Sequence, residues 1–215
     1  MDRRKRLIES IVHSVIIMIL WIVITNLLLT KAKNIYLLLF IGILGLIYSI
    51  LYIKKPYKKE TLILNSWILL ITVVFLGILI GQAIKLSNIV GIIIGISVYD
   101  VVSFTKKGKK TLNAKVMNNK NLMAKFIVYG VSLKDRSPVP TKGVGDFFFY
   151  TIIASGVYKF LDPVIAVNSL IMIFIGCLIN YLIVCHIYNE PGYKGLPATP
   201  IPFALVLGMI MVHFI

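Results

Sequence analysis

Residues 62–83 read LILNSWILLITVVFLGILIGQA, a run that contains no charged residue. A helix needs about 20 apolar residues to cross the hydrocarbon core of a bilayer. Backbone N–H and C=O groups in lipid are satisfied only within a helix or a closed barrel. Because this run is too long for a barrel strand, it predicts a transmembrane helix.

Similar apolar runs occur along the whole chain. About seven predicted spans cover residues 7–30, 35–53, 62–83, 89–104, 143–160, 163–187 and 196–215. The chain is 59% hydrophobic and only 14% charged, which is more apolar than a water-facing surface accommodates. We therefore expect an all-α fold, a polytopic transmembrane helical bundle that forms a single membrane domain over residues 1–215.

The basic segment between the fourth and fifth spans divides this domain. We expect a four-helix N-terminal part at 1–104, a basic cytoplasmic loop at 105–142 and a three-helix C-terminal part at 143–215. Within the loop, Phe126–Tyr129 is β-branched and aromatic, and Ser137–Pro140 has turn-forming residues. Two alternatives stay open for this stretch: a short strand around 126–129, or an interfacial amphipathic helix over 122–133.

The charged residues predict the orientation of the bundle. The chain has 23 Lys and Arg against 8 Asp and Glu, a net charge of +15. Most of the basic residues fall in segments on one side of the predicted spans, and those on the other side are Lys31, Lys33, Lys85 and Lys159. The positive-inside rule then predicts a multi-pass protein of the cell membrane with a cytoplasmic N-terminus and an external C-terminus. The first span is interpreted as a retained signal anchor.

The sequence argues against several classes of function. The positive charge lacks a nucleic-acid recognition motif, so anionic lipid headgroups are the expected partner. Cys177 and Cys185 have no zinc-ligand spacing and are interpreted as small apolar residues, and no H-E-x-x-H occurs, so neither a metal nor a cofactor is expected. A serine intramembrane protease would need its nucleophile in G-x-S-G, and Ser155 lacks the first glycine of that motif.

Two aspartates lie within apolar sequence, Asp100 in ISVYDVV and Asp146 in GVGDFFF. A charged residue at the centre of a membrane helix costs about 2.5–3.5 kcal/mol, so each is a candidate functional residue. The remaining acidic residues lie in charged segments or near a helix end. Among them, Asp162 precedes Pro163, a pattern that predicts a helix N-cap followed by proline at the first helical position.

The two aspartates are expected at a similar depth. Asp100 lies shortly before Lys106 and Asp146 shortly after Lys142, which places them roughly 9 and 6 Å inside the charged boundary on antiparallel helices. Two carboxylates that meet at low dielectric cannot both ionise, so the pair shares one proton. Such a dyad supplies an acid and a base that together activate a water molecule.

Glycines accompany both aspartates. Gly143 and Gly145 are expected to let the helix start bend and a substrate backbone approach Asp146. Gly91 and Gly95 share one helix face and are expected to allow close helix packing beside Asp100.

Three motifs in this order resemble the presenilin and signal peptide peptidase family of intramembrane aspartic proteases, particularly its short prokaryotic and archaeal members. Tyr99-Asp100 is similar to the family's Y-D, Gly143-Val144-Gly145-Asp146 fits G-x-G-D, and Pro197-Ala198-Thr199 resembles P-A-L. The resemblance covers about residues 91–215. It implies that Asp100 and Asp146 are catalytic and that Tyr99, Gly143, Gly145, Pro197, Ala198 and Thr199 shape the substrate site.

The resemblance also implies a substrate class and a mode of binding. The expected substrates are transmembrane helices, such as signal-peptide remnants or single-span proteins, and the loop between the aspartates would donate a strand such as Phe126–Tyr129 to the unwound substrate. Thr199 departs from the family pattern because leucine is expected there, and the chain has fewer spans than is usual. The alternative function is a proton- or cation-coupled transporter or channel that uses the two aspartates. Oligomeric state stays open.

Overall fold

A computed structural model describes residues 3–32, 34–105, 107–190, 193 and 195–213. Lys33, Lys106 and Lys194, which enter the charge prediction, and Phe214 and Ile215, which end the last predicted span, lie outside the described residues. The described chain is mostly helical.

Each of the predicted apolar runs contains a helix. The helices are α1 (Arg3–Lys31), α2 (Ile35–Lys54), α3 (Leu62–Ala83), α4 (Leu86–Ser103), α7 (Val144–Phe160), α8 (Pro163–Ile187) and α9 (Pro200–His213). Among the described residues, five helices are long and apolar enough to cross a membrane: α1, α2, α3, α4 and α8. With 17 residues in α7 and 14 in α9, the other two are shorter. The structure thus supports a membrane protein, with fewer membrane-length helices than the predicted seven spans.

Side chains fix the first turns of two long helices. Asp162 Oδ1 accepts a hydrogen bond from Val164 N (2.7 Å), and Pro163 occupies the first helical position of α8. The predicted N-cap is therefore confirmed. Asn34 Oδ1 caps α2 in the same way, accepting bonds from Tyr36 N and Leu37 N (3.0 and 3.2 Å). Both caps satisfy N–H groups that a helix start leaves without partners.

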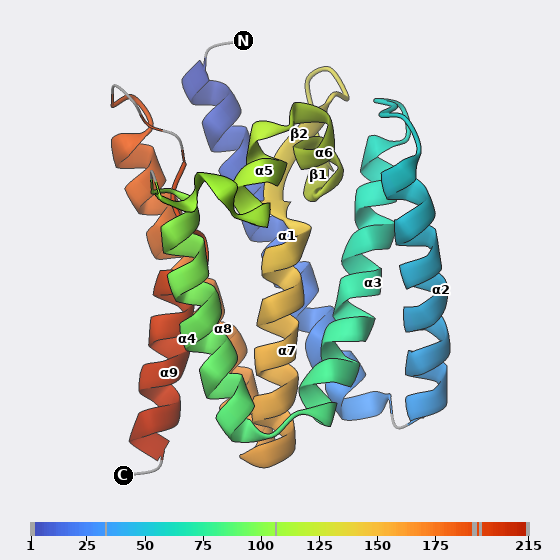
Figure 1. The fold of residues 1–215 in the computed structure, drawn as a ribbon, viewed down its shortest axis with the longest axis vertical. Coiled ribbons are helices and arrows are strands. Elements are labelled where there is room, and N and C mark those ends of the chain that lie inside the picture. The colour runs from blue at the N-terminus through green and yellow to red at the C-terminus, as the bar shows by residue number, and fades with distance from the viewer. Residues whose placement is uncertain (1–2, 33, 106, 191–192, 194, 214–215) are drawn as a thin grey trace.

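Helix α7 lies in the middle of the bundle. It packs against α1, α3, α4 and α8, while α9 packs against α4 and α8 (Figure 1). Phe147, Tyr150, Ile153, Ala154 and Val157 of α7 are completely buried. Figure 1 shows the N-terminal end of α1, the α2–α3 connection and the α5–β2 segment at one end of the bundle, with the C-terminal end of α9 at the other.

Close packing of α3 on α7 depends on small residues. A Cβ at Gly77 would lie 2.8 Å from Thr151 Cβ, and one at Gly81 would overlap the carbonyl oxygen of Ile152. A polar bond reinforces the contact, since Ser155 Oγ of α7 donates to Ile78 O of α3 (2.9 Å). Ser155 is therefore a buried structural residue. Helix α7 is also bonded to α1, where Trp21 Nε1 donates to Thr151 Oγ1 (2.9 Å).

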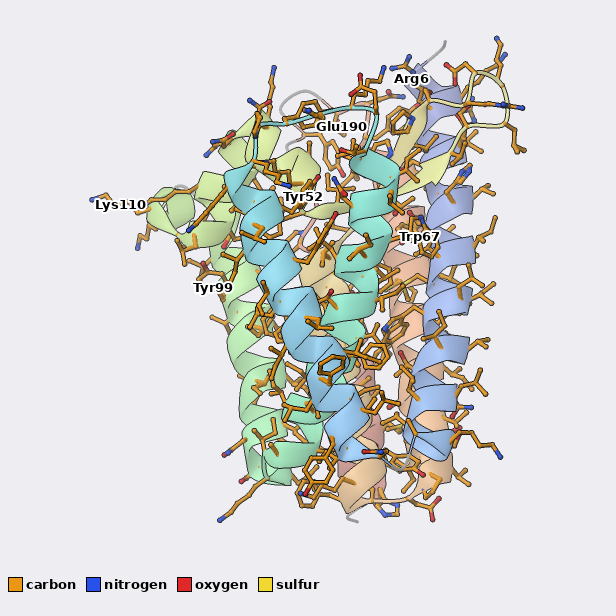
Figure 2. All side chains as sticks on the ribbon, turned by 90° about the vertical axis from the view of Figure 1, so that its right-hand side faces the viewer. Arg6, Tyr52, Trp67, Tyr99, Lys110 and Glu190 are labelled. Carbon is orange, nitrogen blue, oxygen red and sulfur yellow. The ribbon has the colours of Figure 1, made fainter. Side chains whose placement is uncertain are left out.

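The outer faces of the peripheral helices are apolar. Figure 2 shows side-chain nitrogen and oxygen gathered toward the two ends of the bundle and mostly carbon on the helices between. On α2 the exposed side chains include Leu39, Phe40, Ile43, Leu44 and Ile47. Such a continuous exposed apolar surface is typical of a lipid-facing protein.

The segment between α4 and α7 is folded. It contains a 3-10 turn η1 (Lys107–Lys110), α5 (Leu112–Asn118), α6 (Lys120–Lys125), β1 (Ile127–Val131) and β2 (Pro138–Gly143). The strands pair antiparallel, with Tyr129 opposite Pro140. The strand alternative is confirmed, and the interfacial helix over 122–133 is wrong. The chain remains mostly helical, as expected of an all-α fold, and this two-stranded sheet is a small addition to it. Pro138 and Pro140 lie within β2, because prolines are tolerated in edge strands.

The hairpin β1–β2 is wedged between α1 and α3. Tyr129 N donates to Ser66 Oγ (3.2 Å), and Trp67 Nε1 donates to Tyr129 O (3.1 Å). On the other side, Ser10 Oγ donates to Pro140 O (2.6 Å). Each strand thus has a backbone group bonded to a neighbouring helix.

Lys125 joins this segment to the end of α2. It is only 6% exposed, and its Nζ donates to the carbonyl oxygens of Tyr52, Ile53 and Lys55. The last carbonyls of a helix lack intrahelical partners, and a cation is favourable there. Lys125 therefore caps the C-terminal end of α2, and its bonds hold the end of α6 against that helix.

The glycines near Asp100 do not pack as expected. A Cβ at Gly91 or Gly95 meets no atom within 4 Å. The prediction of close helix packing at these two positions is wrong, because the glycines at close helix contacts lie elsewhere, on α2, α3, α7 and α8.

Gly81→Ala is expected to lower the free energy of unfolding by about 1–3 kcal/mol, because the added methyl overlaps the α7 backbone. Gly91→Ala is the matched control, since it adds the same methyl where no atom is close, and its stability should be unchanged or slightly raised. Thermal unfolding of both variants in detergent micelles measures the difference. Equal melting temperatures for the two variants would contradict the packing of α3 on α7.

Candidate active site

Asp100 lies in the last turn of α4 and is 8% exposed. Its Oδ2 accepts hydrogen bonds from Ala198 N (2.8 Å), Thr199 N (3.1 Å) and Thr199 Oγ1 (3.0 Å). Asn113 Nδ2 of α5 donates to its Oδ1 at 3.3 Å. Hydrogen bonds between neutral donors and a carboxylate are stronger than those between neutral groups. The side chain of Asp100 is therefore held in one orientation by residues from two distant parts of the chain.

The Pro197-Ala198-Thr199 segment is non-helical and leads directly into α9. The chain reaches it through Gly195, whose φ of 123° is a conformation that favours glycine. The carbonyl oxygen of Ala198 accepts bonds from Asn180 Nδ2 (2.8 Å) and Tyr150 OH (3.2 Å). With its N–H on Asp100 and its C=O on α7 and α8, the Ala198 backbone is fixed from both sides.

Asp146 lies in the first turn of α7. The start of this helix is tied to the preceding segment, since Val144 N donates to Phe126 O (2.8 Å). A Cβ at Gly143 would lie 3.3 Å from Asp146 Oδ2, closer than most such contacts. Gly143 therefore leaves room for the carboxylate, and a Cβ at Gly145 would meet no atom within 4 Å.

Asp100 and Asp146 line one cavity of about 410 Å³, which we call the Asp cavity. Two antiparallel helices, α4 and α7, bring the carboxylates to it from the end of one helix and the start of the other. Apolar side chains form much of the remaining wall: Phe104, Val116, Met117, Met123, Phe126 and Ile127. The cavity therefore combines two acidic groups with a lining suited to an apolar chain.

The other predicted site residues fall into three groups. Gly143, Gly145 and Ala198 line the Asp cavity. Pro197 lines an adjoining cavity instead, and Thr199 is 3% exposed, with its hydroxyl on Asp100. The side chain at the position of the expected leucine thus contacts the carboxylate directly.

Tyr99 lies beside the Asp cavity and is not part of its wall. Its hydroxyl accepts a hydrogen bond from Asn113 N (3.3 Å), and the side chain is 39% exposed. Figure 2 shows Tyr99 on the side of the bundle where the segment carrying Lys110 projects. Tyr99 therefore fixes the start of α5, which carries the Asn113 amide to Asp100.

Sequence reasoning missed Asn113, Asn180 and Lys142. Lys142 is 6% exposed, donates to Cys177 Sγ (3.3 Å) and lies over the rings of Tyr150 and Tyr181. A polar residue inside an apolar helix, such as Asn180 in LINYL, is a signal that could have been used. Asn113 and Lys142 lie in a basic polar segment, where sequence offers no such contrast.

The hairpin reaches the Asp cavity at one end. Ile127, Thr141 and Gly143 line the cavity, while Tyr129 has its N–H and C=O bonded to Ser66 and Trp67 of α3. The backbone groups of β1 at Tyr129 are therefore already bonded to α3, and the Ile127 and Gly143 end of the hairpin is the part that lies at the aspartates.

Comparisons of the chain with family models, with curated proteins and with solved structures found no match. Among the described residues, no group of three or more His, Cys, Asp or Glu side chains could hold a metal ion. The groups that the site presents are two carboxylates, the hydrogen-bond donors on Asp100 and an apolar wall.

Thr199→Val is expected to destabilise the protein by about 1–3 kcal/mol, because it removes a hydroxyl donor from a buried carboxylate while keeping the shape of the side chain. Thr199→Ser is the control, because it retains the donor. Unfolding in micelles measures the loss, and a double-mutant cycle with Asp100→Leu isolates the pair. Strictly additive effects in that cycle would show that Thr199 and Asp100 do not interact.

Proposed function

We propose that the chain is an intramembrane aspartic endopeptidase of the presenilin-like type, a hydrolase that cuts transmembrane helices with Asp100 and Asp146 as its catalytic dyad. One observation carries the proposal: aspartates from two antiparallel helices line the same apolar-walled cavity. The Pro197-Ala198-Thr199 segment supports it, since this third element of the motif set bonds directly to Asp100. An ion pathway would not require the bonds between this segment and Asp100.

The dyad would work by sharing one proton. The ionised carboxylate takes a proton from a water molecule, whose oxygen attacks the scissile carbonyl carbon. The protonated carboxyl hydrogen-bonds the carbonyl oxygen and stabilises the tetrahedral intermediate. Collapse of the intermediate breaks the C–N bond, and the amine leaves with a proton from the dyad. The four donors on Asp100 would keep its carboxylate aimed during these steps.

The substrate would enter as an apolar chain with its backbone exposed. Gly145 lines the Asp cavity and has no side chain, so a substrate backbone could approach Asp146 there. The Ile127 and Gly143 end of the hairpin offers the nearest strand for pairing. Helical substrates would have to unwind locally, and signal-peptide remnants or single-span proteins fit that requirement.

We infer a multi-pass topology with a cytoplasmic N-terminus and an external C-terminus. The basic segments at Arg3–Arg6, at Lys54–Lys59 and between α4 and α7 gather at one end of the bundle (Figure 1), as the positive-inside rule expects of a cytoplasmic face. In this proposal α7 and α9 also cross, for seven spans in all. The non-helical turn before α9 is tolerable at membrane depth because Asp100, Asn180 and Tyr150 satisfy Ala198.

Asp100→Asn and Asp146→Asn should each abolish cleavage of a single-span helical reporter reconstituted with the purified protein, because either change removes a titrating carboxyl of the dyad. Asparagine keeps the size of aspartate, and circular dichroism with gel filtration verifies the fold. Asp162→Asn, which alters only the α8 cap, is the matched control and should retain activity. Cleavage that persists in both dyad variants would overturn the proposal.

The same proteoliposomes test the alternative of a proton- or cation-coupled transporter or channel. Ion or proton flux that depends on Asp100 and Asp146, in the absence of reporter cleavage by the wild type, would favour that alternative.

Gly145→Ala should raise KM for the reporter by roughly threefold to tenfold, since a methyl would stand where the substrate backbone approaches. Its melting temperature should not fall, because the methyl meets no atom of the protein. Steady-state cleavage and thermal unfolding measure the two effects. A lower melting temperature with unchanged KM would contradict this role of Gly145.

A further inference from the structure

Helices α2 and α3 enclose a cavity of about 460 Å³ next to the turn that connects them, and we call it the α2–α3 cavity. It shares no lining residue with the Asp cavity. Its connecting turn lies at the end of the bundle where the basic segments gather (Figure 1), which is headgroup depth in the inferred topology. The residues that line it come from the end of α2, the turn and the start of α3: Tyr48, Leu51, Tyr52, Lys55, Pro56, Lys58, Thr61 and Asn65.

Two stacked tyrosines give the α2–α3 cavity a fixed amphipathic surface. The ring centroids of Tyr48 and Tyr52 lie 6.4 Å apart, and the ring planes differ by 12°. Tyr48 OH donates to Asn65 Oδ1 (2.5 Å), and Asn65 Nδ2 donates to Thr61 Oγ1 (3.1 Å), which ties the tyrosine to α3. Figure 2 shows Tyr52 toward the end of the bundle that carries Arg6. Tyrosine combines an apolar ring with a polar tip, which suits a membrane–water interface.

Lys55 and Lys58 bring positive charge to the lining. Both side chains are exposed, and among the described residues that line the cavity there is no Asp or Glu. The hydroxyl of Thr61 belongs to the same lining. Ammonium and hydroxyl groups donate to phosphate oxygens, and hydrogen bonds to an ionised acceptor are the stronger ones. This part of the cavity therefore suits a phosphate group.

Lys125 removes an obstacle to anion binding at this place. The last carbonyl groups of a helix carry partial negative charge and disfavour an anion. At the end of α2 the carbonyl oxygens of Tyr52, Ile53 and Lys55 accept bonds from Lys125 Nζ. The same ammonium group lies 5.5 Å from the centroid of the Tyr52 ring. Its charge therefore offsets the negative end of α2 beside the cavity.

An exposed apolar stripe runs along α2 away from the α2–α3 cavity. Leu37, Leu44 and Leu51 are 54%, 51% and 54% exposed, and their seven-residue spacing places them on one helix face. Leu51 also lines the cavity, so the cavity and the stripe are continuous. Helix α3 is the main packing partner of α2, which leaves this face toward lipid. Positive charge, tyrosine rings and apolar surface thus follow one another in the order of the parts of a phospholipid.

We propose that the α2–α3 cavity binds one anionic phospholipid of the cytoplasmic leaflet, in addition to the diffuse attraction of the basic segments for such lipids. Its phosphate lies at Lys55 and Lys58, and an acyl chain follows Leu51 and Leu44. Basic pockets between membrane helices on the cytoplasmic side are typical sites for anionic headgroups. The site uses neither Asp100 nor Asp146, so it does not depend on the proposed protease activity.

Lys55→Gln/Lys58→Gln should weaken binding of dioleoylphosphatidylglycerol about tenfold or more, because it removes both positive charges from the cavity. Lys54→Gln/Lys59→Gln is the matched control, since it removes the same charge from exposed residues of the same segment that do not line the cavity. Its affinity should stay within about twofold of the wild type. Native mass spectrometry of the full chain in neutral detergent, titrated with this lipid, measures the affinities. Equal losses in the two variants would overturn the proposal in favour of diffuse attraction.

Two further measurements identify the ligand and its place. Glycerophosphoglycerol, which has the headgroup without acyl chains, should bind at least about tenfold more weakly, because it buries no apolar chain on Leu51. Equal affinity would overturn the lipid and leave a site for a soluble phosphate ester, and equally tight binding of dioleoylphosphatidylcholine would overturn recognition by charge. In proteoliposomes, phosphatidylglycerol with a diazirine on its acyl chain near the glycerol should cross-link to peptides of α2 and α3. Cross-links confined to other helices would overturn the location.

Discussion

Asp100 Oδ2 accepts three hydrogen bonds from Ala198 and Thr199, and this contact joins two parts of the chain that lie 98 and 99 residues apart. A non-helical turn between apolar helices is costly unless its backbone groups find partners within the protein. Here one carboxylate satisfies two successive N–H groups, and Asn180 and Tyr150 satisfy the Ala198 carbonyl. The turn and the orientation of Asp100 therefore depend on each other.

The position of Asp146 depends on the rigidity of α7. This helix is buried on several sides, and Gly77 and Gly81 of α3 let the two backbones approach closely. The Trp21–Thr151 and Ser155–Ile78 bonds fix its rotation. A carboxylate in the first turn of such a helix is held on a rigid element, which suits the proposed site, where two carboxylates from different helices would act together.

Much of the helical framework could be predicted, because hydrophobic length depends on the local sequence alone. The run at 62–83 matches α3, and Asp162-Pro163 marks the start of α8. The pairing of β1 with β2 could not be predicted, since prolines such as Pro138 and Pro140 are typical of turns. Their place in a strand depends on contacts with β1 on one side and α1 on the other, which are distant in sequence. Asp100 and Asp146 could be predicted as a pair, because each lies at a similar distance from the charged end of its predicted span. Asn113, Asn180 and Lys142 escaped notice, because their importance arises only from contacts with residues far along the chain.

The burial of two lysines changes how the net charge of +15 should be understood. Lys125 and Lys142 are each 6% exposed, the first with its charge against the α2 carbonyls and the second among Cys177, Tyr150 and Tyr181. Neither ammonium group faces the counterion layer at the membrane surface, where each accessible basic residue contributes about 1 kcal/mol of attraction to anionic lipid. Formal charge therefore overstates the positive charge that this end of the bundle presents at its surface, because the ammonium groups of Lys125 and Lys142 lie inside the protein.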